Sequence, residues 1–250
     1  MTTSQLSGSI AVISGASSGI GWATARALAG QGATVLVLAR RTERLKELVD
    51  VIDADGGQAR AYEVDVADAD GTERVIRAIG DEHGRIDVLV NNAGFLANGP
   101  ALDADLSDWH RMIDINLGGV LNLTHAALPY LVSAAEGSRG VADIVSTSSV
   151  AGRRVPGSDS NVYAATKHAV GAFSEALRQE LSSKQVRVGL IEPGVVRTEM
   201  TTGGAKNAPD ATTGRPLDPD DVARAVTYMV TQPAHAAVNE ILLRPTEQVI

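Results

Sequence analysis

A tyrosine and a lysine four positions apart, Tyr163 and Lys167, are side chains whose types and spacing could do chemistry. On a helix, residues at positions i and i+4 lie on the same face. A nearby cation favours the phenolate, so the Lys167 ammonium is predicted to lower the pKa of Tyr163 from its usual value of about 10. Such a tyrosine could protonate a carbonyl oxygen during reduction, or accept a proton from an alcohol.

Hydroxyl side chains precede this pair in the run Ser146–Gly152. The run follows a predicted strand, and ligands bind at the carboxyl ends of strands in open α/β sheets. Ser149 could donate a hydrogen bond to a substrate oxygen, and Ser148 is the alternative. A Ser-His-Asp triad with His168 is not favoured, because no G-x-S-x-G turn occurs and adjacent helical residues point apart.

A glycine-rich turn near the amino terminus joins a predicted strand to a predicted helix, with Gly15, Gly19 and Gly21 in GxxxGxG spacing. Such a turn lets backbone N–H groups approach a diphosphate at the positive end of the helix. The alternative is a turn that is merely tight. The residues predicted to meet a cofactor here are Gly15, Ser17, Ser18, Gly19, Ile20 and Gly21.

Short β-branched runs alternate with segments of helical period, which predicts βαβ units around a buried parallel sheet. Right-handed crossovers then give a doubly wound α/β fold, with helices on both faces of seven parallel strands. Helices are expected over Gly19–Ala29 and Glu43–Ala54, among others. The predicted strands are Ile10–Ser14, Thr34–Leu38, Ala59–Val64, Ile86–Asn91, Ala142–Thr147, Arg187–Glu192 and Glu240–Leu243.

No linker or internal repeat divides the chain, which predicts a single domain over residues 1–250. Irregular segments are expected at Ala134–Gly140 and Thr201–Pro219. The second is rich in Gly, Thr, Pro and Asp, and predicts a flexible substrate flap over approximately residues 198–217.

Composition narrows the classes of partner. A formal charge of −8 and a pI of about 5.1 argue against nucleic acid or an anionic membrane. The sequence has no Cys, and its five His show no metal-ligand spacing, so no metal site is expected. The first residues are polar and the following apolar run is short, which predicts a cytoplasmic protein with no membrane partner.

Several motifs occur in the order and spacing of the short-chain dehydrogenase/reductase family, which the sequence resembles over nearly its whole length. They are Gly15/Gly19/Gly21, Asn91-Asn92-Ala93-Gly94, the Ser before Tyr-x-x-x-Lys, and Pro193-Gly194. Within that family the sequence is most similar to NADP-dependent 3-hydroxy-acid dehydrogenases and clavulanic acid dehydrogenases, including the run 240–248. The resemblance implies a Rossmann-like domain. The spacing from Ser149 to Tyr163 is one residue longer than the usual pattern, so the loop with Arg153, Arg154 and Pro156 could bulge.

The end of the second strand predicts NADP(H) as the cofactor. Ala39 stands where NAD-preferring relatives carry Asp, and Arg40 supplies a guanidinium that can pair with a 2′-phosphate. Arg41 is a second candidate for the same contact. The alternative is that both arginines only solvate a surface loop.

The resemblance implies further site residues. Asp65 would meet the adenine amino group, although it could instead cap the next helix, and Asn116 would hold a water that links Lys167 to solvent, unless it is an ordinary packed residue. Ala164 and Ala165 would leave space for the nicotinamide. The remaining predicted cofactor contacts are Val66, Asn92, Ala93, Gly94, Tyr163, Lys167, Pro193, Gly194, Val196 and Thr198.

The predicted function is hydride transfer between NADP(H) and a carbonyl compound or a primary or secondary alcohol, with Asn116, Ser149, Tyr163 and Lys167 as catalytic residues. The alternatives are an NAD-dependent alcohol dehydrogenase and a non-catalytic NADP-binding scaffold; an extended epimerase would need a larger substrate domain. A homotetramer or dimer is expected through helices near Trp109–Leu131 and Tyr163–Leu181. Candidates for the substrate pocket are Phe95–Ala97, Arg153-Arg154, Val195-Val196 and the segment after Thr198.

Overall fold

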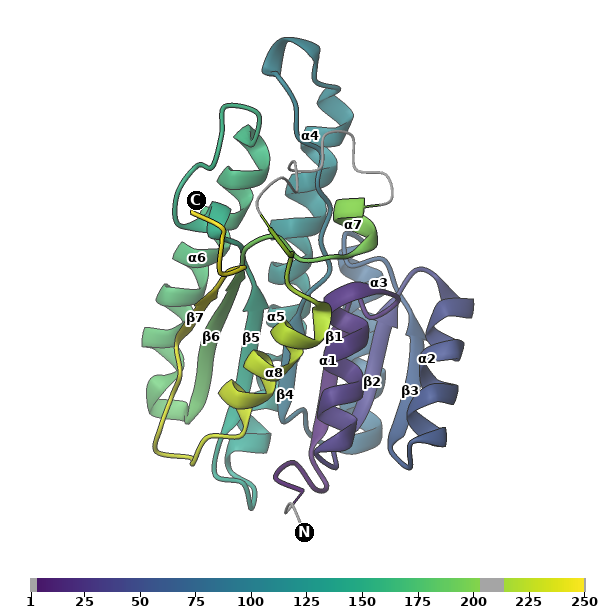
Figure 1. Cartoon of the computed structure of the whole chain (residues 1–250). Coiled ribbons are helices and arrows are strands. Elements are labelled where there is room, and N and C mark those ends of the chain that lie inside the picture. Colours follow the sequence, from purple (N-terminus) through teal and green to yellow (C-terminus); the bar gives the residue numbers. More distant parts are fainter. Residues whose placement is uncertain (1–3, 203–213, 250) are drawn as a thin grey trace.

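One sheet of seven parallel strands organises the protein in a computed structural model that describes residues 4–202 and 214–249 (Figure 1). The strand order is β3-β2-β1-β4-β5-β6-β7. The bounds are β1 Ile10–Ser14, β2 Thr34–Ala39, β3 Gln58–Glu63, β4 Val88–Asn91, β5 Ala142–Thr147, β6 Val186–Pro193 and β7 Glu240–Leu243. The predicted doubly wound α/β fold is therefore confirmed, and β1, β5 and β7 have the predicted bounds.

Helices cover both faces of this sheet. The helices α1 (Gly19–Gly30), α2 (Thr42–Ala54) and α8 (Pro219–Val230) share one apolar cluster, and α3 (Ala69–His83), α5 (Gly119–Ala135) and α6 (Asn161–Leu181) share another. Successive strand residues point to opposite faces, so Ile13 packs in the first cluster and Val12 in the second. Burial on both faces explains why the central strands read as continuous apolar runs, whereas the edge strands β3 and β7 are partly exposed.

Short helical segments connect the main elements. They are η1 (Ala101–Asp103), α4 (Leu106–Ile113), the π-helix η2 (Asp114–Gly118), η3 (Val150–Gly152), η4 (Ser182–Lys184) and α7 (Glu199–Thr202). The two segments predicted to be irregular are shorter than expected. Helix α5 continues to Ala135, α7 includes Thr201 and Thr202, and Pro219 is the first residue of α8. The rest of the predicted flap, residues 203–213, lies outside the described residues.

The strand order reverses at β1, whose neighbours are β2 and β4. Helices that follow β1 and β4 lie on opposite faces of the sheet, which leaves a crevice at the carboxyl ends of these strands. In Figure 1 that edge is uppermost, below the short helix α7. The fold thus brings together residues that follow β1, β2, β3, β4, β5 and β6.

Candidate active site

A cavity of about 510 Å³ lies at this edge of the sheet, a size typical of ligand sites. It runs from the glycine turn after β1 to the tyrosine of α6. Sequence-predicted residues that line it are Gly15, Ser17, Ser18, Gly19, Ile20, Arg40, Arg41, Asp65, Val66, Asn92, Ala93, Gly94, Ser149, Tyr163, Lys167, Pro193, Gly194, Val196 and Thr198. One cavity therefore collects predicted cofactor contacts and predicted catalytic side chains.

The glycine turn fits closely against the end of β4. Gly15 has a φ of +65°, and a Cβ there would lie 2.8 Å from the Ala93 Cα. The Ser14 hydroxyl accepts hydrogen bonds from the backbone nitrogens of Asn92, at 3.0 Å, and Ala93, at 3.1 Å. Gly21 does not line the cavity; a Cβ there would lie 2.5 Å from the Gly15 carbonyl oxygen, so its place in the structure is to let the helix pack under the turn.

Charged groups occupy the end of the cavity beside β2 and β3. Arg40 Nη1 lies 3.5 Å from Asp65 Oδ2, and both side chains are about half exposed. Arg41 donates to Ser17 Oγ through Nε, at 3.1 Å, and through Nη2, at 3.0 Å. The alternative role for Asp65 as a helix cap is wrong, because Asp68 caps α3 by accepting from the Gly71 nitrogen at 3.1 Å.

The predicted catalytic hydroxyls meet at the other end of the cavity. Ser149 and Tyr163 form a side-chain hydrogen bond, and Ser149 also accepts from the Ala151 nitrogen at 3.1 Å. Ser148, the alternative, is buried and donates to the Lys167 carbonyl oxygen at 3.2 Å. This geometry favours Ser149 as the serine that faces a substrate oxygen, because the Ser148 hydroxyl is used to hold α6 against β5.

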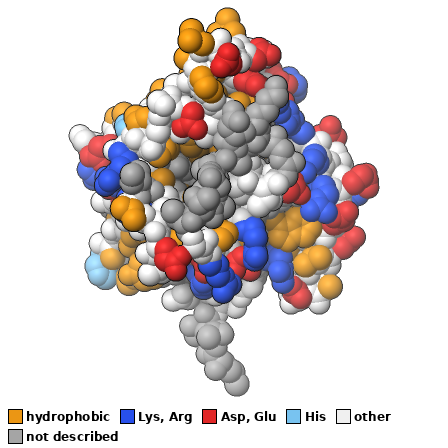
Figure 2. All heavy atoms as spheres, turned by 45° about the horizontal axis from the view of Figure 1, so that its top comes forward, with side chains coloured by type: hydrophobic (Ala, Val, Ile, Leu, Met, Phe, Trp, Pro, Cys, Tyr) orange, Lys and Arg blue, Asp and Glu red, His pale blue; other side chains and the backbone are white. Residues whose placement is uncertain are grey.

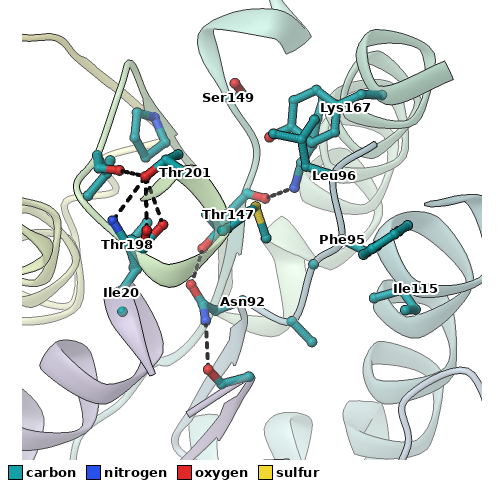
Figure 3. A pocket seen from close by; sticks show the side chains of 18 of the residues that line it. Ile20, Asn92, Phe95, Leu96, Ile115, Thr147, Ser149, Lys167, Thr198 and Thr201 are labelled. Atoms are coloured by element: carbon teal, nitrogen blue, oxygen red, sulfur yellow. Dashed lines mark hydrogen bonds between the residues drawn. The ribbon is translucent and has the colours of Figure 1, made fainter. Parts of the chain in front are cut away.

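The expected lowering of the Tyr163 pKa is not found in the structure. Burial raises the pKa of Tyr163, and the hydrogen bond with Ser149 lowers it by a smaller amount. The Lys167 ammonium lies 5.7 Å from the centre of the Tyr163 ring and donates to the Thr147 carbonyl oxygen at 2.7 Å (Figure 3). Burial also lowers the pKa of Lys167 to about 8. Removal from water, which disfavours both charged forms, therefore outweighs the attraction between them here.

Asn116 lies in the π-helix η2 and does not line the cavity. Its Oδ1 accepts from the Phe95 nitrogen at 2.7 Å, and its Nδ2 donates to the Phe95 carbonyl oxygen at 2.9 Å and to Thr166 Oγ1 at 3.2 Å. The structure therefore supports the alternative of a packed polar residue, since the buried amide fastens the cavity wall at Phe95 to α6, and the water that Asn116 would hold stays a prediction. π-Helical turns occur often at functional sites.

Other predicted residues lie away from the cavity. Arg153 Nε is bound to both carboxylate oxygens of Glu192, at 2.9 and 2.8 Å, and Arg153 also pairs with Glu240. Residues predicted to face the pocket but absent from its wall are Ala97, Arg153, Arg154, Ala164 and Ala165. The idea that Ala164 and Ala165 make room for a nicotinamide is wrong, because Ala164 is packed in the interior and Ala165 faces outward. His168 bonds within its own helix, to the Ala164 carbonyl oxygen at 2.8 Å.

Several lining residues were not found by sequence reasoning. Gln248 lies beside Gly194, and its Oε1 accepts from the Val195 nitrogen at 2.9 Å. Pro156 comes from the loop that follows η3, and this loop packs on Gly99, whose nitrogen donates to the Asp159 carbonyl oxygen at 3.0 Å. Met200 and Thr201 also line the cavity and belong to the segment after Thr198, a predicted pocket candidate; the lining residues that were not predicted further include Asn98, Ile115, Val150, Ala151 and Ser160. None of them carries a local sequence signal, since each reaches the site only through tertiary packing.

The chemistry of this wall fits a phosphorylated dinucleotide. The cavity includes the first turn of α1, where backbone N–H groups favour anions, and the two arginines at the end of β2. Gly94 lines the cavity, and a Cβ there would make only ordinary contacts, 3.5 Å from Asn116 Oδ1 and 3.7 Å from Met200 Cε, so packing within the protein does not require a glycine at this position. Over residues 4–202 and 214–249, no His, Asp and Glu side chains gather as a metal site, and no helix is long and apolar enough to cross a bilayer.

The face of the molecule around the cavity carries both signs of charge. Figure 2 shows Lys and Arg side chains next to Asp and Glu side chains over this face, with no broad basic area. Within the described residues, the cations that line the cavity are Arg40, Arg41 and Lys167. The fold and the cavity together define a dinucleotide-binding α/β protein.

Comparisons with known proteins agree with this class. The family model for short chain dehydrogenases matches residues 9–208, and the chain belongs to this family. Sulfoacetaldehyde reductase 2 of Chromohalobacter salexigens is 42% identical over 247 residues, which cover 96% of this chain and 95% of the relative. Serine 3-dehydrogenase of Agrobacterium fabrum is 40% identical over 250 residues, which cover 97% and 96%.

A solved structure extends the likeness to the cofactor. A metagenomic short-chain oxidoreductase in complex with NADP superposes with a TM-score of 0.81 and 33% identity, over 98% of this chain and 100% of the other. The chain is therefore an NADP-dependent short-chain oxidoreductase. The finer resemblance to 3-hydroxy-acid and clavulanic acid dehydrogenases stays a prediction.

Proposed function

We propose that the protein interconverts a small carbonyl compound and its alcohol, with Tyr163 as the general acid and base. The observation that carries this proposal is the hydrogen-bonded pair of Ser149 and Tyr163 in the cavity that also contains the glycine turn. Two convergent hydroxyls can hold one oxygen atom, and a proton must reach that oxygen when a carbonyl is reduced. NADPH, when bound, supplies the hydride.

Each side chain has a separate task in this proposal. Ser149 donates a hydrogen bond to the substrate oxygen, which stabilises the negative charge that develops there. Tyr163 delivers its proton to that oxygen in reduction and accepts it in oxidation. The raised pKa of Tyr163 keeps the hydroxyl protonated at neutral pH, which suits the acid role in carbonyl reduction.

Lys167 and Asn116 support the tyrosine from the buried side. Lys167 has a pKa of about 8, so near neutral pH it can both hold and release a proton. Its ammonium is fixed by the Thr147 carbonyl oxygen, and Asn116 fixes the neighbouring wall at Phe95 and Thr166. We infer that these two residues hold the proton path from Tyr163 toward solvent.

The wall beyond Tyr163 supports a short substrate. It combines apolar side chains, Leu96, Ile115, Val150 and Met200, with polar ones, Asn98, Ser160 and Gln248. The names of the two relatives support a small substrate with a polar group, since one relative is named for sulfoacetaldehyde and the other for serine. We propose a short aldehyde or ketone with one polar substituent as the substrate class.

A substrate panel tests this function. NADPH oxidation is followed by absorbance with sulfoacetaldehyde, a neutral aldehyde of similar length and a larger ketone, and NADP⁺ reduction is followed with serine and a simple 3-hydroxy acid. We expect turnover with at least one short compound, faster with NADPH than with NADH. Turnover with none of them, despite NADPH binding, would instead support the non-catalytic scaffold.

We also propose a homo-oligomer, a dimer or a tetramer, in the cytoplasm. Ile113 in α4 and Leu121 in α5 are large apolar side chains that remain about 40% exposed in a single chain. Both lie within Trp109–Leu131, one of the two segments expected to form the interface. Light scattering of the purified protein gives its molar mass, and the mass of a single chain would contradict the proposal.

A further inference from the structure

Arg41 binds two serines through one edge of its guanidinium group and a glutamate through its remaining nitrogen. Nε and Nη2 point to the Ser17 hydroxyl, at 3.1 and 3.0 Å, and Nη2 also donates to Ser18 Oγ at 2.8 Å. Nη1 donates to Glu199 Oε2 at 2.8 Å. Ser17 lines the cavity and Glu199 does not, so the edge with Nε and Nη2 is the one on the cavity side.

Glu199 comes from a distant part of the chain. It is the first residue of α7 and lies 158 positions after Arg41. Its neighbours Thr198 and Met200 line the cavity, whereas Glu199 lines an adjacent surface hollow with Ser18 and Trp22. The carboxylate therefore reaches Arg41 from outside the cavity.

Glu199 keeps its charge at neutral pH. The hydrogen bond from Arg41 is the main cause that lowers the pKa of Glu199, and Arg44 contributes from 3.8 Å. Arg44 itself pairs with Glu47, at 2.7 Å, so Arg41 is the cation that Glu199 contacts most closely. An ionised carboxylate can fix the orientation of a guanidinium group because each N–H donor lies in a rigid plane.

We propose that Glu199 is a positioning residue for recognition of the NADP 2′-phosphate. It holds Nη1 of Arg41, so that the opposite edge faces the cavity; Nε and Nη2 on that edge donate to Ser17 and Ser18 here, and these donors would turn to a 2′-phosphate. Two parallel N–H donors on one edge match two oxygens of a phosphate. The inference rests on the cofactor role of Arg41 within the proposed site, and it adds a residue that lies outside that site.

The position of the Glu199 carboxylate indicates that it orients Arg41 and does not compete with a phosphate for the same nitrogens. A carboxylate that occupied the Nε and Nη2 edge would exclude a phosphate and weaken its binding. Glu199 occupies the opposite nitrogen, so its removal should leave the guanidinium held by Ser17 and Ser18 alone, less firmly oriented, and should weaken binding instead. Because the pair is about half exposed, the expected effect is modest.

The test measures dissociation constants of NADPH and NADH for the full-length protein by cofactor fluorescence. We expect Glu199→Ala to weaken NADPH binding about threefold to fivefold and to leave NADH binding within about twofold. Glu199→Gln, whose amide oxygen can still accept from Nη1, should have an NADPH dissociation constant between those of the wild type and Glu199→Ala. The matched control is Glu47→Ala, which removes the same charge from the neighbouring Arg44 and should leave both constants within about twofold.

A double-variant cycle completes the experiment. In an Arg41→Ala background, Glu199→Ala should have no further effect on NADPH binding. Tighter NADPH binding in Glu199→Ala would show competition and overturn the proposal. Equal weakening of NADPH and NADH, or no weakening at all, would overturn it too. These titrations need no turnover, so failure of the proposed catalysis would not alter their outcome.

Discussion

The two ends of the cavity differ in how far their polar groups are removed from water. At the adenosine end, beside β2 and β3, Arg40 and Arg41 are about half exposed, and each is paired with a carboxylate. At the catalytic end, Lys167 is 5% exposed and Asn116 is 1% exposed. Charges near water contribute little singly, whereas buried polar groups depend strongly on each partner.

This difference separates the groups proposed to select the cofactor from the groups proposed to transfer the proton. In our proposal, recognition of a 2′-phosphate is spread over several exposed groups, so changes there should alter affinity by small factors. The proposed proton transfer would depend on a few buried groups with shifted pKa values, so changes there should alter turnover by large factors. Variants at the two ends should therefore affect different measured quantities.

Among three variants that compare the two ends of the cavity around Tyr163, the largest effect is expected for Lys167→Met, which removes the buried ammonium beside Tyr163. We predict that turnover falls about a hundredfold, because the proton path and the fixed position of Tyr163 are lost. Steady-state rates at saturating NADPH measure this effect. Lys184→Met, an exposed lysine in η4, is the control and should keep wild-type turnover.

The same variant should gain stability in a pH-dependent way. Burial lowers the pKa of Lys167 to about 8, so below pH 8 the folded protein holds a charge that the unfolded chain accommodates better. Lys167→Met should be about 1 to 2 kcal/mol more stable at pH 7, after allowance for the lost bond to Thr147. The gain should shrink as pH rises above about 8. Denaturant unfolding at neutral and alkaline pH checks both points, and a gain that grows with pH would contradict the assignment.

A smaller effect is expected for Asn116→Ala, which leaves the Phe95 backbone nitrogen and oxygen without their side-chain partners. We predict about a tenfold loss of turnover and about 2 kcal/mol of lost stability, since unpaired polar groups near the interior are costly. The control is Asn122→Ala, which removes a similar bond, to the Val66 carbonyl oxygen at 2.9 Å, at the adenosine end. Equal losses of turnover in Asn116→Ala and Asn122→Ala would contradict the expected difference between the two ends of the cavity.

The smallest effect of the three is expected for Arg40→Ala at the exposed end. NADPH affinity should fall about fivefold while NADH affinity and turnover at saturating NADPH stay near wild type, because one half-exposed phosphate contact is lost. Fluorescence titration measures both affinities. Arg77→Ala, an exposed arginine of α3 paired with Glu73, should change neither. Unchanged NADPH affinity in Arg40→Ala would mean that Arg40 does not bind the 2′-phosphate.

The sequence predicted the scaffold and the residue types of the site well. Continuous apolar runs located the central strands, since strands buried on both faces need such runs, whereas the partly exposed edge strand β3 has no such run. The start of β4 was placed two residues early, at Ile86. The reason is Asp87, whose carboxylate accepts from the Ile10 nitrogen at 2.8 Å before the ladder with β1 begins. A side chain of this kind substitutes for backbone pairing and leaves no periodic signal.

Tertiary contacts account for what the sequence could not predict. The lowered pKa expected for Tyr163 followed from helical spacing alone, but burial raises this pKa and the hydrogen bond with Ser149 opposes the rise by a smaller amount. The π-helical turn around Asn116 and the contact of Gln248 with Val195 likewise depend on distant partners. Such pairs become visible only when the chain is folded.

The most direct test of the central claim is Tyr163→Phe, measured for both turnover and NADPH binding. The variant removes only the hydroxyl that is proposed to carry the proton, and Tyr228→Phe, at an exposed position in α8, is the matched control. We predict that turnover of the best substrate falls about a thousandfold in Tyr163→Phe while its NADPH dissociation constant stays within about twofold of wild type. Near-wild-type turnover with intact NADPH binding would contradict the assignment of Tyr163 as the general acid and base.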